Sequence, residues 1–413
     1  MDGVKTVAVI GLGYIGLPTA TILATNGMKV IGVDVNSATV AAVNKGEVPF
    51  VEPDLETFMV GAVTQGNLTA TTETPEADVY VIAVPTPFQE GYQPDLSYIY
   101  AAVDQIAPKL RGGELLILES TSPPGATEKM AERVLASRPD LDQSNDRQIV
   151  HFAHCPERVL PGRIMIELVT NDRIVGGITK EAALKAKELY ESFCEGEILL
   201  TDARTAEMVK LVENSYRDVN IAFANELSLI AEKLDIDVWE LIELANHHPR
   251  VNILQPGPGV GGHCIAVDPW FIVSATPDEA RLIRKSREVN EAKPKWVIDN
   301  VTEKAERLKK PIIAALGLAF KPDIDDLRAS PSVAIVEALA DQLSDGHIYV
   351  VEPHIEDLPS SLSEKSNVTL STKDHALDES DIILLLVDHT AFKSVGSEKL
   401  ASKIVIDTKG IWR

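Results

Sequence analysis

The start of the chain contains the feature that most restricts its fold. A strand-like segment at residues 5–10 (KTVAVI) is followed at once by Gly11, Gly13 and Gly16. The first glycine permits a tight turn, the second lets a pyrophosphate approach the backbone, and the third lets helix and strand pack closely. The next apolar run ends at Asp34, where a carboxylate can accept hydrogen bonds from a ribose 2′-hydroxyl. The segment therefore predicts a βαβ unit that binds NAD, because the carboxylate would repel the 2′-phosphate of NADP.

Strand-like and helix-like segments continue to alternate, which is typical of parallel sheets covered by helices on both faces. We expect an α/β protein with two Rossmann-like, doubly wound parallel-sheet domains joined by a long central helix and a helical dimerisation region. The later strands are expected at 79–84, 114–119, 150–154, 312–318, 347–353, 381–388 and 403–409. The expected domains are an NAD-binding domain (1–200), a central helical domain (201–308) and a second Rossmann-like domain (309–413).

The longest predicted helix covers residues 203–234, which include neither proline nor glycine. At about 1.5 Å per residue it would extend roughly 45 Å, more than the width of a small domain. Its apolar residues occupy more than one stripe, so we expect burial on several faces, in part against a second subunit. Two further helices are expected around 278–308, interrupted near Pro294, and Ser330 followed by Pro331 predicts the start of another.

Charge and cysteine content exclude several classes of partner. The 413 residues carry a net charge of −23, which disfavours binding to nucleic acids and anionic membranes. No apolar run approaches a membrane span, the N-terminus lacks a signal-peptide pattern, and the three cysteines lie far apart. We therefore expect a cytoplasmic protein. The segment HFAHC (151–155) lacks further ligands at a recognisable spacing, so no metal site is expected.

Polar residues follow several of the expected strands, at the edge where open α/β sheets bind ligands. Thr86 and Thr121 follow two neighbouring strands, although ordinary loop positions are the alternative. Glu157 and Arg158 follow the strand at 150–154, where a carboxylate can activate water and a guanidinium can meet a phosphate. A surface turn is the alternative interpretation of that pair.

The long helix carries Lys210, Asn214 and Arg217 at a spacing that places them on one face. An ammonium and an amide on such an apolar helix can donate hydrogen bonds to a substrate oxygen, and a desolvated lysine loses its proton more readily. A solvated stripe along the helix is the alternative.

Cys264 follows the glycine-rich segment GPGVGG, and Asp268 lies four residues later. Gly261 and its neighbour allow close backbone approach, and a nearby cation such as Lys210 would favour the reactive thiolate. An inert core cysteine is the alternative. Near the second sheet, Lys321 and Arg328 would suit a diphosphate, or would belong to a charged surface loop.

Taken together, these segments resemble the UDP-glucose/GDP-mannose dehydrogenase family, and within it most closely the bacterial UDP-N-acetyl-D-mannosamine dehydrogenases. The resemblance extends over almost the whole chain and rests on VIGLGYIGLPTA, IAVPTPF, ILESTSPPG, PERVLPG, RTAEMVKLVENSYRDVNIAFANELSLI, NHHPRVNILQPGPGVGGHCIAVDPWFI and GLAFKPDIDDLR. It implies a homodimer or higher homo-oligomer with NAD as cofactor and a UDP-sugar as substrate bound in part by the C-terminal domain.

The resemblance also implies roles for individual residues. Cys264 would be the nucleophile, Lys210 and Asn214 would orient the substrate and stabilise oxyanions, and Glu157 would activate water near Thr121 and Asp268. The implied contacts to the nucleotide sugar are Arg158, Val159, Lys210, Asn214, Arg217, His248, Arg250, Gly261 and Lys321. The implied contacts to NAD are Gly11, Gly13, Tyr14, Ile15, Gly16, Asp34, Thr86, Thr127 and Arg328.

The implied activity is a four-electron oxidation of the C6 hydroxyl of a UDP-sugar, through a thiohemiacetal and a thioester on Cys264. UDP-N-acetyl-D-mannosamine is the expected substrate, and its uronate would enter a cell-envelope polysaccharide. Pro161 stands where many UDP-glucose dehydrogenases have a second glutamate, which argues against glucose. The alternatives are UDP-GlcNAc or UDP-glucose as substrate, a two-electron hydroxyacid dehydrogenase, and a non-catalytic NAD-binding regulator.

Overall fold

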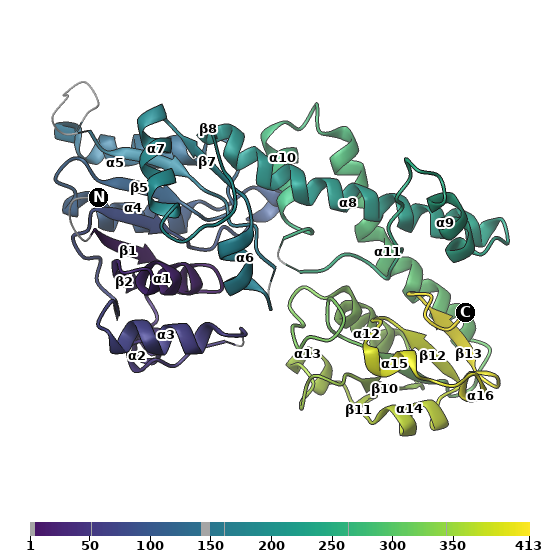
Figure 1. Cartoon of the computed structure of the whole chain (residues 1–413). Helices are drawn as coiled ribbons and strands as arrows, with labels where there is room; N and C mark the ends of the chain where they lie inside the picture. The colour runs from purple at the N-terminus through teal and green to yellow at the C-terminus, as the bar shows by residue number, and fades with distance from the viewer. Residues whose placement is uncertain (1–4, 51, 142–148, 161, 263, 344) are drawn as a thin grey trace. The chain divides into compact units, whose positions relative to one another are not determined.

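The computed structural model describes residues 5–50, 52–141, 149–160, 162–262, 264–343 and 345–413. The chain divides into two compact units, Met1–Glu213 and Asn214–Arg413 (Figure 1). Pro161, the position that argued against glucose, lies outside the described residues.

The described part of the first unit contains one eight-stranded sheet in the order β3-β2-β1-β4-β5-β6-β7-β8. The neighbours from β3 to β6 pair in parallel, as expected, whereas β7 pairs antiparallel with β6. The strands are β1 (Thr6–Ile10), β2 (Lys29–Val33), β3 (Leu68–Thr71), β4 (Val79–Ile82), β5 (Leu115–Leu118), β6 (His151–His154), β7 (Arg173–Gly177) and β8 (Ile198–Asp202).

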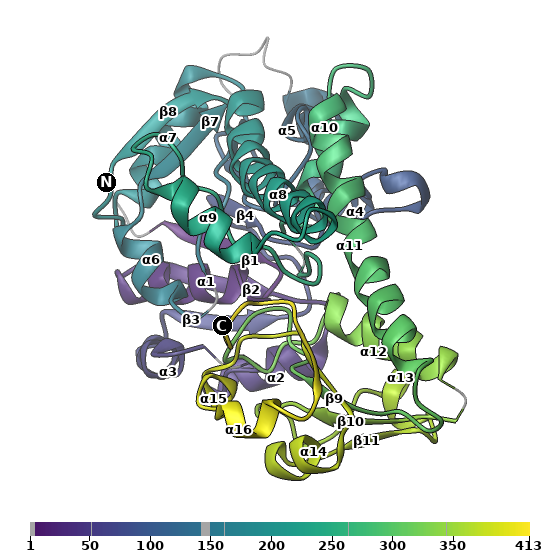
Figure 2. The ribbon, with the colours of Figure 1, turned by 90° about the vertical axis from the view of Figure 1, so that its right-hand side faces the viewer.

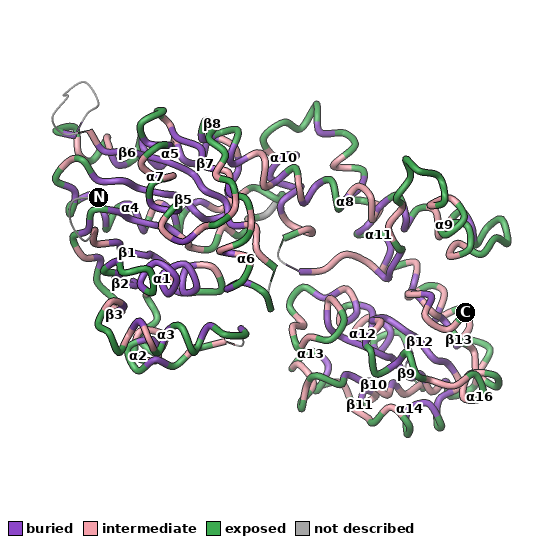
Figure 3. The backbone as a smooth tube through the Cα atoms, in the orientation of Figure 1, coloured by how far each residue is buried: buried purple, intermediate pink, exposed green. Residues whose placement is uncertain are grey.

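Helices cover both faces of this sheet, so its central strands are buried on both sides (Figure 3). In β1, Val7 and Val9 join one apolar cluster while Ala8 and Ile10 join the other. The helices are α1 (Gly16–Thr25), α2 (Ser37–Lys45), α3 (Leu55–Thr64), α4 (Ser97–Ile106), α5 (Ala126–Ser137), α6 (Ile164–Thr170) and α7 (Lys180–Tyr190).

The long helix α8 (Ala203–Lys233) forms as predicted. In the second unit it lies beside α11 (Arg281–Ala305), and the buried Asp218 of α8 contacts Arg287 and Asn290 of α11 (Figure 2). The prediction of an interruption near Pro294 is wrong, because α11 continues through that residue. Buried side chains on both sides of the proline, Asn290 and Val297, hold the helix in place by packing. The other helices here are α9 (Val238–Asn246) and α10 (Asp268–Ala275).

The described part of the second unit also contains a five-stranded parallel sheet, in the order β11-β10-β9-β12-β13. Its strands are β9 (Ile312–Leu316), β10 (His347–Val351), β11 (Val368–Leu370), β12 (Ile382–Leu385) and β13 (Ile404–Asp407). Its helices are α12 (Pro331–Gln342), α13 (Ser360–Ser363), α14 (Lys373–Glu379), α15 (Thr390–Lys393) and α16 (Ser397–Leu400). The Ser330 side chain caps α12, as its sequence predicts. No helix in the described ranges has both the length and the apolar character of a membrane span.

Candidate functional site

The glycine motif forms the turn between β1 and α1, and each glycine has a distinct steric role. Gly11 has a φ of +94°, and a Cβ there would lie 2.5 Å from the carbonyl oxygen of Ala83. A Cβ at Gly16 would lie 1.9 Å from the carbonyl oxygen of Gly11, so only glycine fits. A Cβ at Gly13 would meet no described atom within 4 Å, which leaves open space above the turn. This arrangement fits the backbone approach that a pyrophosphate requires.

Asp34 lies directly after β2 and is hydrogen-bonded to the glycine turn between β1 and α1. Its Oδ2 accepts a hydrogen bond from the Leu12 amide at 2.9 Å, and its Oδ1 accepts one from the Asn36 amide at 2.8 Å. A carboxylate has about four lone-pair positions, so these two bonds leave capacity for a ribose hydroxyl.

The loops after β4 and β5 meet at the carboxyl edge of the sheet, next to the reversal of strand order at β1. The Thr86 hydroxyl donates to the Thr121 carbonyl oxygen at 2.5 Å, and the Ser120 hydroxyl donates to the Val84 carbonyl at 2.7 Å. Two predicted threonines are therefore brought together, at the position where open α/β sheets bind ligands.

Thr127 is completely buried at the start of α5, and its amide and hydroxyl donate hydrogen bonds to Glu207 of α8. Glu207 accepts hydrogen bonds from the Thr127 amide and hydroxyl at 2.7 and 2.6 Å and from the Gly125 amide at 2.6 Å. A carboxylate at a helix N-terminus is electrostatically favoured, although burial raises the pKa of Glu207. Glu207 was not predicted, because it lies 80 residues from Thr127 and no local pattern links the two.

Glu157 is buried just beyond β6 and is held by two donors. Its Oε1 accepts a hydrogen bond from the Arg158 amide at 2.7 Å, and its Oε2 lies 3.0 Å from Nη2 of the buried Arg173. The Arg158 side chain forms an ion pair with Glu213 at 3.3 Å. The other predicted residues of this unit are exposed or half-buried: Tyr14, Ile15, Val159 and Lys210.

A second buried carboxylate, Glu119, lies in the same region and was not predicted. It accepts hydrogen bonds from the Thr19 hydroxyl at 3.1 Å and from the Tyr190 hydroxyl at 3.0 Å. Burial, and then the nearby charge of Glu157, raise the pKa of Glu119 to about 7. Burial also raises the pKa of the neighbouring Cys155 thiol to about 12, which keeps that cysteine protonated and unreactive.

In the second unit, the predicted site residues Asn214 and Asp268 contact each other. The Asn214 amide nitrogen donates to Oδ2 of Asp268 at 2.5 Å, and both side chains are buried. Lys210 lies one turn earlier than Asn214 on α8. Cys264 is exposed, and its carbonyl oxygen accepts hydrogen bonds from the Val267 and Asp268 amides, so the cysteine leads directly into α10.

The glycine-rich loop before Cys264 packs against the segment that follows β9. A Cβ at Gly261 would lie 2.6 Å from Cδ of Pro331 and 2.7 Å from the Ala329 carbonyl oxygen, so the contact requires glycine. The same segment carries the half-buried Lys321 and the exposed Arg328, which pairs with Asp326 at 2.6 Å. The structure leaves Arg217, His248 and Arg250 exposed at the surface of this unit.

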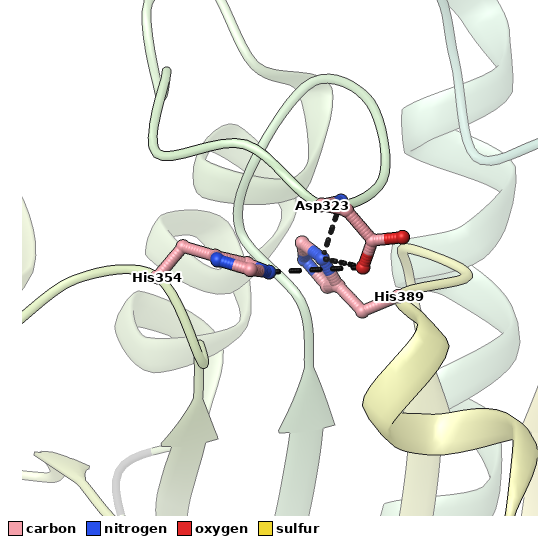
Figure 4. Close-up of side chains that lie close together, drawn as sticks. All are labelled: Asp323, His354 and His389. Carbon is pink, nitrogen blue, oxygen red and sulfur yellow. Dashed lines mark hydrogen bonds and ion pairs between the residues drawn. The ribbon is translucent and has the colours of Figure 1, made fainter. Parts of the chain in front are cut away.

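One group of potential metal ligands occurs among the described residues, at the carboxyl edge of the second sheet (Figure 4). Asp323, His354 and His389 bring their ligand atoms within 4.8 Å of one another. His389 is already bonded on both sides, because its Nδ1 accepts from the Asp323 amide and its Nε2 lies 3.0 Å from Glu352. The Asp323 carboxylate in turn accepts from the amide and hydroxyl of Thr390. These bonds fix the loop that carries Lys321.

The raised pKa of Glu119 predicts a pH-dependent effect of Glu119→Gln on stability. Between the unfolded pKa of 4.5 and the folded value of about 7, only the unfolded chain loses this proton, so stability falls as pH rises. The glutamine variant lacks this loss. As the pH is raised from roughly 4.5 to 7, the free energy of unfolding of the variant should therefore rise by about 3 kcal/mol relative to that of the original protein.

Urea unfolding followed by circular dichroism measures this difference. The four tryptophans all lie after residue 213, so their fluorescence reports the second unit separately. An equal stability difference at the two pH values would contradict the assignment of a buried, protonated Glu119.

Comparison with known proteins places these features in a family. The chain matches three models of the UDP-glucose/GDP-mannose dehydrogenase family: the NAD binding domain at residues 5–194, the central domain at 204–292 and the UDP binding domain at 314–413.

Full-length relatives agree with these matches. The chain is 56% identical to an NDP-N-acetyl-D-galactosaminuronic acid dehydrogenase from Ralstonia nicotianae, over 99% of this chain and 96% of that protein. It is 54% identical to the UDP-N-acetyl-D-mannosamine dehydrogenase of Escherichia coli, over 99% of both chains. The solved UDP-D-ManNAc dehydrogenase of Pyrococcus horikoshii is 39% identical, with a TM-score of 0.88, over 99% of this chain and 96% of that one. The chain therefore belongs to the UDP-glucose/GDP-mannose dehydrogenase family and is an NAD-dependent dehydrogenase.

Proposed function

We propose that this dehydrogenase oxidises the C6 hydroxyl of UDP-N-acetyl-D-mannosamine to the carboxylate, with Cys264 as the covalent nucleophile. The observation that carries the proposal is the arrangement around Cys264. Cys264 is an exposed residue, its loop leads into Asp268 at the start of α10, and Asp268 contacts Asn214 of α8. A relative at 56% identity is named for N-acetyl-D-galactosaminuronic acid, so UDP-N-acetyl-D-galactosamine is the second candidate.

When bound, NAD would supply the hydride acceptor. The two oxidation steps would use two NAD molecules in succession, each accepting one hydride. The open space above Gly13 and the carboxylate of Asp34 would hold its pyrophosphate and ribose. The meeting of the Thr86 and Thr121 loops at the same sheet edge supports a nicotinamide position there.

The thiol of Cys264 would attack the aldehyde carbon to form a thiohemiacetal, which the second oxidation converts to a thioester. Lys210 and Asn214 would donate hydrogen bonds to the developing oxyanions, a contribution typically worth about 3 kcal/mol for each donor. An amide nitrogen carries two donors, so Asn214 would use one for Asp268 and the other for the oxyanion. Glu157 would take a proton from water as that water attacks the thioester, releasing the uronate and the Cys264 thiolate.

Counting reduced cofactor tests this scheme directly. Purified protein with excess NAD and a limiting amount of each UDP-sugar in turn should form two NADH per molecule of UDP-N-acetyl-D-mannosamine. UDP-N-acetyl-D-galactosamine, UDP-GlcNAc and UDP-glucose are the comparison substrates, and absorbance at the NADH band is the measurement. A yield of one NADH per sugar would contradict the covalent four-electron scheme.

Within the same assay, Cys264→Ala should abolish formation of the uronate. Cys194→Ala is the matched control, because Cys194 is half-buried and its thiol donates to the backbone carbonyls of Asn171 and Gly196. Equal loss in both variants would point to general damage, and full activity of Cys264→Ala would remove this thiol from the mechanism.

The chain should also form a homodimer through α8. Tyr216, Phe223 and Ile230 recur at seven-residue intervals and are 69%, 53% and 46% exposed in the single chain. An exposed apolar seam at this spacing is typical of a helix that packs against another helix.

Phe223→Glu should therefore convert the dimer to a monomer, because it places a charge in the seam. Light scattering coupled to gel filtration measures the mass. Leu282→Glu, at a 68% exposed site on α11, is the control and should leave the mass unchanged. A Phe223→Glu protein with the mass of the original assembly would exclude this face.

The proposal includes a three-part division of function along the chain, with NAD bound by residues 1–200, dimerisation by 201–308 and UDP-sugar binding by 309–413. A cytoplasmic location and a role in supplying uronate to a cell-envelope polysaccharide belong to the same proposal.

A further inference from the structure

The reversed strand β7 explains how Arg173 comes to lie beside Glu157. Among the described pairings of the first sheet, only β6 and β7 run antiparallel, with His154 opposite Gly176. Continuing that register beyond the end of β6 places Arg173, the first residue of β7, opposite Glu157. If β7 ran parallel to β6, its first residue, Arg173, would instead lie near the start of β6, at the opposite edge of the sheet from Glu157.

Arg173 makes several contacts in addition to its ion pair with Glu157. Its guanidinium lies 4.8 Å from the ring centre of Tyr190 and 5.1 Å from that of Phe193, and it donates to the Leu168 carbonyl at 3.3 Å. Its Nη1 lies 3.8 Å from the sulfur of Cys155. The side chain is almost completely buried, so neither its position nor its charge is easily changed by solvent.

We propose that Arg173 is a positioning residue for Glu157, which it holds in the orientation required to activate water in thioester hydrolysis. This inference rests on the proposed function of Glu157. The terminal torsion of a glutamate is broad, so an unrestrained carboxylate turns easily. Here the Arg158 amide holds one oxygen and Arg173 holds the other, which fixes the plane of the carboxylate.

Glu119 determines how much of the charge of Arg173 is available to Glu157. Glu119 bonds to Thr19 and Tyr190 rather than to the guanidinium. Burial, followed by the charge of Glu157, raises the pKa of Glu119 to about 7. Below about pH 7 Glu119 is mostly protonated, which leaves Glu157 as the carboxylate beside the guanidinium of Arg173.

The test separates the oxidation steps from hydrolysis in Arg173→Met and Arg173→Lys. Rapid mixing with NAD and the UDP-sugar should give two NADH per active site at the rate of the original protein. Hydrolysis should then be slower, by roughly tenfold or more in Arg173→Met and by less in Arg173→Lys, because a general base contributes about 100-fold or more. Mass spectrometry of the quenched protein should show the acyl adduct on Cys264. Because only hydrolysis slows, kcat and KM for the sugar should fall together and kcat/KM should stay unchanged.

Glu119→Gln is the matched control, since it changes a buried side chain of the same cluster that does not bond to Glu157. It should hydrolyse the thioester within about twofold of the original rate at a pH near 6, where the original Glu119 is mostly protonated. NAD affinity, measured by titration, reports whether the first unit remains folded in all three variants.

The inference is overturned if Arg173→Met hydrolyses the adduct at the original rate, or if both oxidation steps slow by the same factor as hydrolysis. An equal slowing in Glu119→Gln would overturn it too, because the effect would then come from the cluster as a whole. Failure of the proposed function is distinguishable, because the unsubstituted protein would then not produce two NADH. If Arg173→Met does not fold, the comparison of Arg173→Lys with Glu119→Gln decides.

Discussion

The first unit depends on a contact in which helix α1 begins directly against the turn that leaves β1. The carbonyl oxygen of Gly11 occupies the space that a Cβ of Gly16 would need. This approach lets α1 pack on the sheet while the amides of the turn stay at its carboxyl edge. The loops after β4 and β5 reach the same edge and are joined by the Thr86–Thr121 bond. The loop before Cys264 uses glycine in a comparable way, since Gly261 lies against Pro331 and Ala329.

The surroundings of Glu157 and those of Cys264 differ in how far polar and charged groups are buried. Around Glu157, charges are buried and compensated by Arg173, and Cys155 is kept protonated by burial. Around Cys264, the thiol is exposed and the polar pair Asn214 and Asp268 lies at the start of α10. The same residue type is therefore an inert part of the interior in one place and a candidate nucleophile in the other.

Local patterns were sufficient for much of the fold. The glycine motif, the apolar runs of β1, β2, β4, β5 and β6, the uninterrupted α8 and the Ser330 cap all carry their signal within a few neighbouring residues. Pro294 misled the prediction because packing on both sides outweighs one missing backbone hydrogen bond. Glu119, Arg173 and Glu207 could not be found in the same way. Their partners are distant in the sequence. The contact between Arg173 and Glu157 also depends on the antiparallel direction of β7, which no local sequence pattern indicates.

We propose that Sγ of Cys264 and the nicotinamide ring of NAD both face C6 of the bound sugar. A crystal structure of the protein with NAD and an unreactive 6-deoxy UDP-sugar would measure this directly. The account predicts that Sγ of Cys264 lies about 3.5 Å from C6, with the nicotinamide on the other side of that carbon. A sulfur beyond contact distance of C6, in a complex where C6 still faces the nicotinamide, would contradict it.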